Sequence, residues 1–577
     1  MKLGYTAGTL DTGQLPQEDK PIAKHRLHGL RHFLGLFAGE HVAGTEFVIG
    51  ATFVLWGVSA ADVLLGLIFG NLLAVLTWTF ICAPIATDTR LTLYSYLKKI
   101  AGPSMQKVYN AVNGVLYCVL GGAMITVAAS AVRILFGIPV QTQWYPTSAS
   151  FIFLVLIIGS IVAIVAAMGF KSVAQFSSIC APWLLLMFIS GAVVMLPELV
   201  AMSGTVSGLH SVSDFLQLAN AHIWTGQPMG GGEEMGMLHV MAFAWIANLA
   251  MHGGLSDMAI FRFAKSYRYG YASAVGVFFG HYIAWICAGI MGAAAAMVLN
   301  TSIAQLDSGE VAYQALGAVG ILAVIIAGWT TSNPTLYRAG LAFQTIFHRY
   351  SVRRVTAITG AVTTVIACFP FVFTKLLDFV GYMGLILVPV GTIVFTEHWI
   401  FPKIGYTRYW AQYKGLRLNV PALASWMIGV AFAVCMDTFG IIHLYFLFVP
   451  TWVVTMVAYL ILAGLGGARE QYPEAEREEK QRQEQIRQEQ AIEAEGISPH
   501  PGSQISSTRI KVAGASALLA ILALLGMAGA VFAGMMELDE YKALALVPSL
   551  IYFVSATIWI GKKEQSKESV SSRTPSL

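Results

Sequence analysis

Long apolar stretches alternate with short polar segments over most of the 577-residue chain. Each stretch is long enough for a helix of roughly 20 residues, which is the length that crosses the hydrocarbon core of a bilayer. The pattern predicts an all-α integral membrane protein with about 14 transmembrane helices. The expected spans are 33–56, 62–84, 107–135, 149–169, 173–196, 236–261, 270–298, 314–337, 355–374, 378–400, 421–441, 443–465, 511–533 and 543–561.

Two of these stretches are interrupted at their centres by glycines and polar residues. The span 33–56 carries Gly39-Glu40-His41-Val42-Ala43-Gly44-Thr45-Glu46, and the span 236–261 carries His252-Gly253-Gly254-Leu255-Ser256-Asp257. A charged group at mid-depth costs roughly 2.5 kcal/mol or more, and unwound backbone is tolerated there only where protein or a water-filled cavity satisfies it. Broken helices at corresponding places in two halves of a chain indicate the substrate site of a secondary transporter. The sequence therefore predicts transport of a small molecule across a membrane.

Composition and motifs narrow the class further. Of the residues, 56% are hydrophobic and 11% are charged, against roughly 25% charged in a typical soluble domain. The net charge of +4 is small for this length, and no basic patch with interleaved aromatics suggests nucleic acid. The chain contains no HExxH or GxSxG motif, so we expect no enzyme activity. A channel is disfavoured because no selectivity-filter segment repeats along the sequence.

The distribution of Lys and Arg predicts the orientation of the spans in the cell membrane. If both termini are cytoplasmic, the inner loops hold most of the basic residues, whereas the outer loop 197–235 holds none. The Gly- and Ala-rich span 511–533 suits close helix packing and leaves homo-oligomerisation open. The expected domains are a cytoplasmic tail 1–32, a first five-helix repeat 33–196, an extracellular loop 197–235, a second repeat 236–400, peripheral helices 401–465, a charged cytoplasmic linker 466–510, a helical hairpin 511–561 and a cytoplasmic tail 562–577.

A polar motif in the span 314–337 suggests where a cation binds. The carbonyl of Ala327 and the hydroxyls of Thr330 and Thr331 lie on adjacent positions of one helix turn, and three oxygens suit a small hard cation. Carbonyls freed by the first break, near Ala43, would complete the set. In membrane helices the threonine hydroxyl also donates a hydrogen bond to a carbonyl of its own helix. Thr330 and Thr331 by themselves therefore fit either a Na⁺ site or such hydrogen bonds to the backbone.

Beyond these local patterns, the chain resembles the nucleobase:cation symporter family, which includes bacterial cytosine permease and the hydantoin transporter. The resemblance covers about residues 30–465. It rests on the segments Ala327-Gly328-Trp329-Thr330-Thr331, Leu336-Tyr337-Arg338-Ala339-Gly340-Leu341, Gly70-Asn71-Leu72-Leu73 and Pro389-Val390-Gly391.

This resemblance implies a LeuT-like 5+5 inverted repeat with broken spans 1 and 6, and Na⁺ held between spans 1 and 8. It also implies uptake of nucleobases or related nitrogen heterocycles by alternating access. Coupling to H⁺ stays open, because Glu46 lies mid-span and could carry a proton. A same-fold symporter for an amine, an amino acid or a vitamin such as thiamine is the alternative, because Glu46 would suit a cationic ligand.

The candidate substrate-binding residues come from the two breaks and from the spans that flank them. Asn110, Asn113 and Tyr117 lie about one turn apart on span 3, which lines the pocket in the resembling family, although Asn side chains also hold helices together. His252 could contact the ligand or bond a backbone carbonyl freed by its neighbouring glycines. The full set is Gly44, Thr45, Glu46, Asn110, Asn113, Tyr117, His252, Gly253, Gly254 and Asn333, beside the cation-site residues Ala43, Ala327, Thr330 and Thr331.

Overall fold

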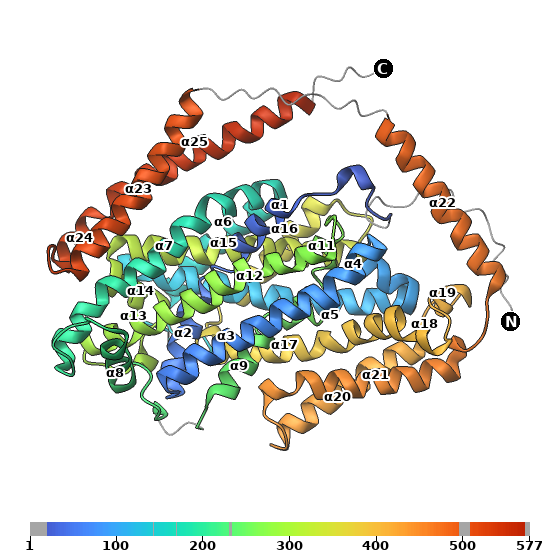
Figure 1. Ribbon diagram of the computed structural model, residues 1–577, viewed down its shortest axis with the longest axis horizontal. Coiled ribbons are helices and arrows are strands. Elements are labelled where there is room, and N and C mark those ends of the chain that lie inside the picture. The colour runs from blue at the N-terminus through green and yellow to red at the C-terminus, as the bar shows by residue number, and fades with distance from the viewer. Residues whose placement is uncertain (1–19, 142, 169, 230–233, 496–507, 572–577) are drawn as a thin grey trace.

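The computed structural model describes residues 20–141, 143–168, 170–229, 234–495 and 508–571 (Figure 1). These ranges form helices joined by loops, and they contain no strand beyond two isolated β-bridges. Eleven of the helices in these ranges are long and apolar enough to cross a membrane. The chain is therefore a multi-pass, all-α membrane protein, which confirms the predicted fold class.

Two sets of five spans form the centre of the molecule. The first set comprises α1 (Leu30–Glu40) with α2 (Thr45–Leu55), α3 (Ala60–Thr77) with the π-helix η4 (Trp78–Cys82) and α4 (Ala83–Thr89), α5 (Leu93–Leu135), α6 (Ala149–Ala167) and α7 (Phe170–Ser203). The second comprises α9 (Met237–Ile246) with α10 (Leu249–His252) and α11 (Met258–Phe261), η6 (Tyr267–Ala272) with α12 (Ser273–Gly276), the π-helix η7 (Val277–Ala284) and α13 (Trp285–Val298), α15 (Ala318–Ile346), α16 (Val352–Ala367), and α17 (Val372–Phe395) with η9 (Thr396–Ile400) and α18 (Phe401–Ile404). Between the spans lie α8 (Val212–His222) and α14 (Ser308–Leu316).

The packing of these spans is symmetric under exchange of the two sets. Span 1 packs on span 7 through α2 and α13, and span 6 packs on span 2 through α9 and α3. Spans 3 and 8 pack along their length through α5 and α15, and spans 4 and 9 do so through α6 and α16. Exchanging spans 1–5 with 6–10 converts the first two contacts into each other and each of the last two into itself. Spans 2 and 7 also both contain a π-helical segment, η4 and η7. This is the relation that the predicted 5+5 repeat requires.

Both predicted helix breaks are present. In span 1 the backbone leaves the helix after Glu40 and resumes it at Thr45. In span 6 it is non-helical between His252 and Met258, and Leu255 has a φ of 62°. Span 6 is also interrupted between Ile246 and Leu249, which the sequence did not predict.

The expected 14 spans and the eleven long apolar helices differ at three places. The ranges 33–56 and 236–261 are divided into short helices by their breaks, and the expected range 355–374 corresponds to the 16-residue helix α16. Pro370 lies in the loop after α16, and a residue that precedes a proline disfavours helical geometry. Residues 372–374 therefore belong to α17 rather than to the end of span 9.

The remaining helices surround this bundle. They are η3 (Lys24–Arg26), η8 (Ile303–Gln305), α19 (Trp410–Tyr413), α20 (Val420–Thr438), η10 (Leu444–Phe446), α21 (Phe448–Ala463), η11 (Gly464–Ala468), α22 (Pro473–Glu495), α23 (Thr508–Phe532), α24 (Leu538–Leu544) and α25 (Leu546–Ser571). The α23–α25 hairpin packs on α7, where Trp183 Nε1 donates to Ser549 Oγ at 3.1 Å. Helix α22 crosses the end of the bundle at which α4, α18 and α19 lie (Figure 1).

Helix α22, which the charge pattern predicts to be a solvated linker, is docked on the bundle. Glu479 is buried and forms an ion pair with Lys99 Nζ at 2.7 Å. Ile486 is buried as well, and Gln490 Nε2 donates to the carbonyl of Pro21 at 2.7 Å. The helix therefore joins the start of α5 to the segment that precedes α1.

Candidate functional site

A cavity of about 100 Å³ lies between the break of span 1 and the interrupted part of span 6. The first break and its flanks contribute Glu40, His41, Ala43, Thr45, Glu46 and Ile49, and span 6 contributes Ala247, Asn248, Ala250 and Met251. The rest of the lining comes from spans 3, 7, 8 and 10: Tyr117, Leu120, Met124, His281, Trp285, Thr331, Pro334, Thr335, Arg338, Leu376, Val380 and Met383. The sequence predicted a site between the breaks; the cavity borders the predicted break of span 1, but in span 6 it borders residues 247–251 rather than the predicted break at 252–257.

Glu46 is the most buried acid of this lining, with 3% of its surface exposed. It lies in the first turn of α2, where the positive end of the helix dipole favours a carboxylate. Its Oε2 accepts a hydrogen bond from Trp285 Nε1, and its backbone N–H donates to the carbonyl of Ala43. None of the ion pairs between described residues includes Glu46.

Two aromatic rings of span 7 connect Glu46 to the other break. Trp285 and His281 stack with ring centroids 4.4 Å apart and planes 3° apart. His281 Nε2 accepts a hydrogen bond from Asn248 Nδ2 at 3.1 Å. Asn248 lies in the interruption of span 6 between Ile246 and Leu249. The series Glu46–Trp285–His281–Asn248 therefore joins the broken part of span 1 to this interruption of span 6. His281 belongs to the π-helix η7, and π-helical turns frequently occur at functional sites.

A second charged group of the lining is already paired. Arg338 of α15 forms an ion pair with Glu40 at the end of α1, and both side chains are largely buried. Arg338 follows Thr331 by seven residues and Thr335 by three, so the three side chains share one face of α15. The pair fixes the first half of span 1 to span 8 beside the cavity.

The predicted cation-site residues lie where the break of span 1 passes span 8. A Cβ atom on Gly44 would lie 2.9 Å from Val127 Cγ1 and 3.1 Å from Gly328 N, so a larger residue would require these neighbours to shift. The hydroxyls of Thr330 and Thr331 both donate to the carbonyl of Ala327, at 3.1 and 3.2 Å. Because their hydrogens are used in this way, the lone pairs of both hydroxyl oxygens stay available to a cation. Ala43 and Thr331 also line the cavity, so the oxygen-rich junction borders the space between the breaks.

Several predicted substrate-binding residues lie outside the cavity lining. Asn110 donates to Thr345 Oγ1 at 2.6 Å, and Asn113 donates to Tyr94 Oη at 2.9 Å. Asn110 therefore joins span 3 to span 8, which was the alternative interpretation, whereas Asn113 bonds a residue at the start of its own helix α5. Asn333 is buried on α15, and neither its amide oxygen nor its amide nitrogen has a hydrogen-bond partner. Tyr117 does line the cavity, and its hydroxyl donates to Ser256 Oγ at 3.4 Å.

The residues of the second break have structural partners. His252 Nε2 donates to the carbonyl of Trp245 at 2.8 Å, so the histidine satisfies a backbone group of its own broken span. Gly253 packs against α17, because a Cβ on Gly391 would overlap the carbonyl oxygen of Gly253 at 1.9 Å. Neither His252, Gly253 nor Gly254 lines the cavity. Their role in binding stays a prediction, and the geometry favours positioning of the break.

The sequence did not single out His281, Trp285, Asn248 or Arg338 as site residues. Arg338 follows directly after the expected span 314–337, whereas in the structure it lies inside α15, where an arginine is costly and usually functional. His281 and Trp285 are spaced by four residues in span 7, which puts them on one helix face, but no sequence feature indicates that this face meets Glu46. That contact follows only from the packing of span 7 on span 1.

Comparison with known proteins identifies relatives by structure alone. No family model and no curated protein sequence matches the chain. The structure of Mhp1, a nucleobase-cation-symport-1 family transporter, closed with bromovinylhydantoin bound, superposes with a TM-score of 0.59 at 14% identity, over 78% of this chain and 95% of Mhp1. Inward-facing Mhp1 gives the same TM-score at 13% identity, over 78% and 94%. A substrate-bound, outward-open Na⁺-coupled sialic acid symporter gives 0.53 at 14% identity, over 75% and 89%.

These similarities establish the fold. The chain has the LeuT-type fold of secondary transporters, as the broken spans and the sequence resemblance predicted. The matched solved structures are transporters and not enzymes.

Proposed function

We propose that the chain is a cation-coupled symporter that takes up a planar nitrogen heterocycle of the nucleobase or hydantoin type by alternating access. The observation that carries this proposal is the cavity between the breaks, where Glu46 lies beside the stacked rings of Trp285 and His281. A planar ring gains from an aromatic face, and its N–H groups match a carboxylate acceptor. Mhp1, which has the same fold, is described with a hydantoin bound.

The coupling cation is assigned to the junction of spans 1 and 8. Ala43, Ala327, Thr330 and Thr331 supply carbonyl and hydroxyl oxygens there, which are the ligands that hard cations prefer. Na⁺ is favoured because these donors are neutral and lie beside the unwound backbone at Gly44. The sialic acid symporter that shares the fold is described as Na⁺-coupled.

The two ligands would assist each other through the first break. A cation at the junction orders the backbone between Glu40 and Thr45, and the same segment contributes Thr45 and Glu46 to the cavity. Coupling requires that each ligand binds better when the other is present, and this dependence is reciprocal. The bundle of spans 1, 2, 6 and 7 would then rock against spans 3, 4, 8 and 9 around the cavity. The ion pair between Glu40 of span 1 and Arg338 of span 8 connects these two groups of spans. During each transport cycle this pair must either break or be carried along by the movement of both spans.

A cationic substrate, such as an amine or thiamine, is the second candidate. It is favoured by the charge of Glu46, which has no cationic side-chain partner among the described residues. A buried carboxylate needs a cation, a proton or strong donors to stay at this depth. The same observation supports H⁺ as an alternative coupling ion.

A ligand screen distinguishes these candidates. Purified protein is heated with nucleobases, hydantoins, amines, amino acids or thiamine, each with Na⁺ and with choline in its place. A heterocycle that raises the unfolding temperature more in Na⁺ than in choline supports the first candidate. A cationic ligand that does so, while neutral heterocycles have no effect, supports the second. If no ligand in the panel raises the unfolding temperature, both substrate proposals are wrong.

A further inference from the structure

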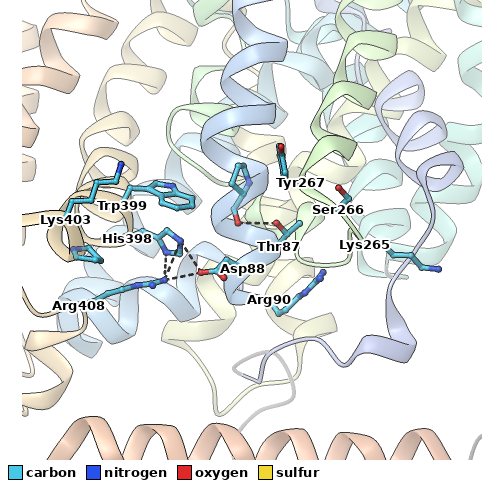
Figure 2. Close-up of a pocket in the computed structure, with 12 residues that line it drawn as sticks. Thr87, Asp88, Arg90, Lys265, Ser266, Tyr267, His398, Trp399, Lys403 and Arg408 are labelled. Carbon is cyan, nitrogen blue, oxygen red and sulfur yellow. Dashed lines mark hydrogen bonds and ion pairs between the residues drawn. The ribbon is translucent and has the colours of Figure 1, made fainter. Parts of the chain in front are cut away.

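A second, larger cavity of about 730 Å³ lies at the end of the bundle where the sequence predicts the cytoplasm. It is formed by α4, the loop before η6, and the segment from η9 to Arg408. Figure 2 shows Lys403, Trp399, His398 and Arg408 on one side of the end of α4, and Lys265, Ser266 and Tyr267 on the other. We call this space, lined by these residues together with Pro84, Thr87, Asp88, Arg90 and Pro402, the basic basin.

The basic basin carries a surplus of positive charge. Its lining contains four cations, Arg90, Lys265, Lys403 and Arg408, but one carboxylate, Asp88. Asp88 Oδ2 is already bonded to His398 Nε2 at 3.2 Å and to Arg408 Nη2 at 3.3 Å. His398 is neutral in this arrangement, because its Nδ1 accepts from Arg408 at 2.6 Å. Asp88 therefore serves to position Arg408 and leaves the basin strongly attractive to an anion.

Two of the cations are rigidly held and two are free to follow a ligand. Arg90 donates to the backbone carbonyls of Arg262 and Ala264, so its guanidinium is fixed in the wall. Lys265 and Lys403 are exposed. Fixed guanidinium groups beside flexible ammonium groups suit a phosphate, which accepts several charge-assisted hydrogen bonds.

Exposed apolar side chains lie close in sequence to the lining of the basin. Phe80, four residues before Pro84, is 53% exposed, and its ring lies 6.2 Å from that of Tyr271, which is 48% exposed and four residues after Tyr267. Ile404, next to Lys403, is 49% exposed. Such apolar side chains outside a membrane helix bundle contact acyl chains, whereas basic pockets between spans on the cytoplasmic side recognise anionic headgroups. Trp399 and Tyr267 in the lining are also the residue types that anchor spans at the interface.

We propose that the basic basin binds the phosphate headgroup of an anionic phospholipid, with the acyl chains lying over Phe80, Tyr271 and Ile404. A free phosphorylated molecule offers the same phosphate, but it would leave these apolar side chains unused. The lipid would hold the ends of spans 2 and 10 together beside the loop that joins spans 6 and 7.

Native mass spectrometry of the full-length protein in detergent tests the proposal with phosphatidylglycerol, phosphatidylcholine and inorganic phosphate as probes. The double variant Lys265→Gln/Lys403→Gln removes two exposed charges and keeps both side-chain stems. A basic residue near an anionic lipid is worth about 1 kcal/mol, so this variant should bind phosphatidylglycerol ~30-fold more weakly. The charge-matched control Lys107→Gln/Arg353→Gln removes two exposed basic residues of α5 and α16 that do not line the basin, and it should bind as wild type does.

Three results would overturn the proposal. They are equal phosphatidylglycerol binding by both double variants, no preference for phosphatidylglycerol over phosphatidylcholine, and inorganic phosphate displacing the lipid at equal concentration. Unchanged phosphatidylcholine binding and an unchanged unfolding temperature show that a variant is folded, so a loss confined to the anionic lipid supports the basin.

Discussion

Glu46 is the side chain whose chemistry defines the proposed substrate site. Its carboxylate meets the indole N–H of Trp285 at the wall of the cavity. Replacing it with Gln keeps the shape and one acceptor but removes the charge. A charge-assisted hydrogen bond contributes about 1.5–3 kcal/mol, so Glu46→Gln should weaken substrate binding ~10- to 100-fold at saturating Na⁺, measured by ligand-induced thermal shifts.

The same variant separates ligand binding from proton coupling. If Glu46 carries the coupled proton, Glu46→Gln should bind substrate normally and lose the pH dependence of uptake. Trp285→Phe is the companion variant, because it keeps the aromatic face and removes the donor to Glu46. A Glu46→Gln protein that matches wild type in affinity, Na⁺ response and pH profile would show that the pocket has been placed wrongly.

Thr330 and Thr331 test the cation site. Each hydroxyl would supply one oxygen to a dehydrated Na⁺, so Thr330→Ala or Thr331→Ala should weaken Na⁺ affinity ~10-fold, a typical loss for a disturbed metal site. The measurement is the Na⁺ concentration that gives half-maximal substrate binding. Thr455→Ala is a matched control, because Thr455 donates to Thr451 O at 2.8 Å in the same way on the peripheral helix α21. Unchanged Na⁺ dependence in both site variants would refute the assignment.

At the residue scale, the sequence predicted those members of the site whose position is unusual in itself. A carboxylate beside a glycine in mid-span, such as Glu46, has no structural explanation in an apolar helix. His281 and Trp285 are ordinary residues of an apolar span, and their function depends on packing between spans 7 and 1. Asn110 and Asn113 show the reverse, because these polar residues of suitable spacing bond other protein side chains, Asn110 on span 8 and Asn113 at the start of its own helix.

Among the elements, the first half of span 1 depends on its attachment to span 8. Removing one partner of a buried ion pair costs about 3 kcal/mol or more, because a charge stays unpaired. Glu40→Gln should therefore lower the unfolding temperature more than the double variant Glu40→Gln/Arg338→Gln does. Lys375→Gln, which breaks the exposed Lys375–Asp378 pair, should have almost no effect. Equal effects of the single and double variants of the buried pair would contradict this connection.

Helix α22 provides a pH-dependent contact outside the membrane. Burial alone would raise the pKa of Glu479, but Lys99 at 2.7 Å lowers that pKa below its ordinary value. A lowered pKa in the docked state stabilises docking above the ordinary value of about 4.3, and this contribution is lost as the pH falls through the lowered pKa. Amide hydrogen exchange of α22 should therefore be constant between about pH 7 and pH 5 after correction for intrinsic rates, and should rise below about pH 4.

Two variants isolate the contribution of Glu479. Glu479→Gln should increase exchange in α22 at neutral pH. Glu478→Gln, which changes the exposed neighbouring residue, should leave it unchanged. Protection that is equal in the two variants would mean that other contacts hold the helix.

At the element scale, glycines and charged residues predicted both helix breaks, because their effect on helix formation is local and can be inferred from the sequence alone. The additional interruption at Asn248 was not predicted, because it coincides with a hydrogen bond from the Asn248 side chain to His281 of another span, and such a contact cannot be inferred from local sequence. The end of span 9 was placed too late for a related reason. Hydropathy does not change at Pro370, although the backbone does.

For the whole molecule, the repeat was predicted from the family resemblance over about residues 30–465, and the membrane orientation from the distribution of Lys and Arg along the chain. The contacts of the ten central spans agree with the repeat. The orientation is testable with membrane-impermeant maleimide on intact cells, after the exposed Cys435 is replaced by Ser. A cysteine at Ser213 should react from outside and one at Gln485 only after permeabilisation. Reaction of both from the same side would refute the predicted arrangement.

Uptake into proteoliposomes tests the central proposal of cation-coupled transport most directly. Purified protein is reconstituted, and uptake of a labelled ligand from the thermal-shift screen is followed under an inward Na⁺ gradient, an inward H⁺ gradient or no gradient. The proposed mechanism predicts accumulation above equilibrium under the Na⁺ gradient, and loss of this accumulation in Thr330→Ala and Glu46→Gln. Ligand that only equilibrates under every gradient, or that accumulates equally well in both variants, would contradict it.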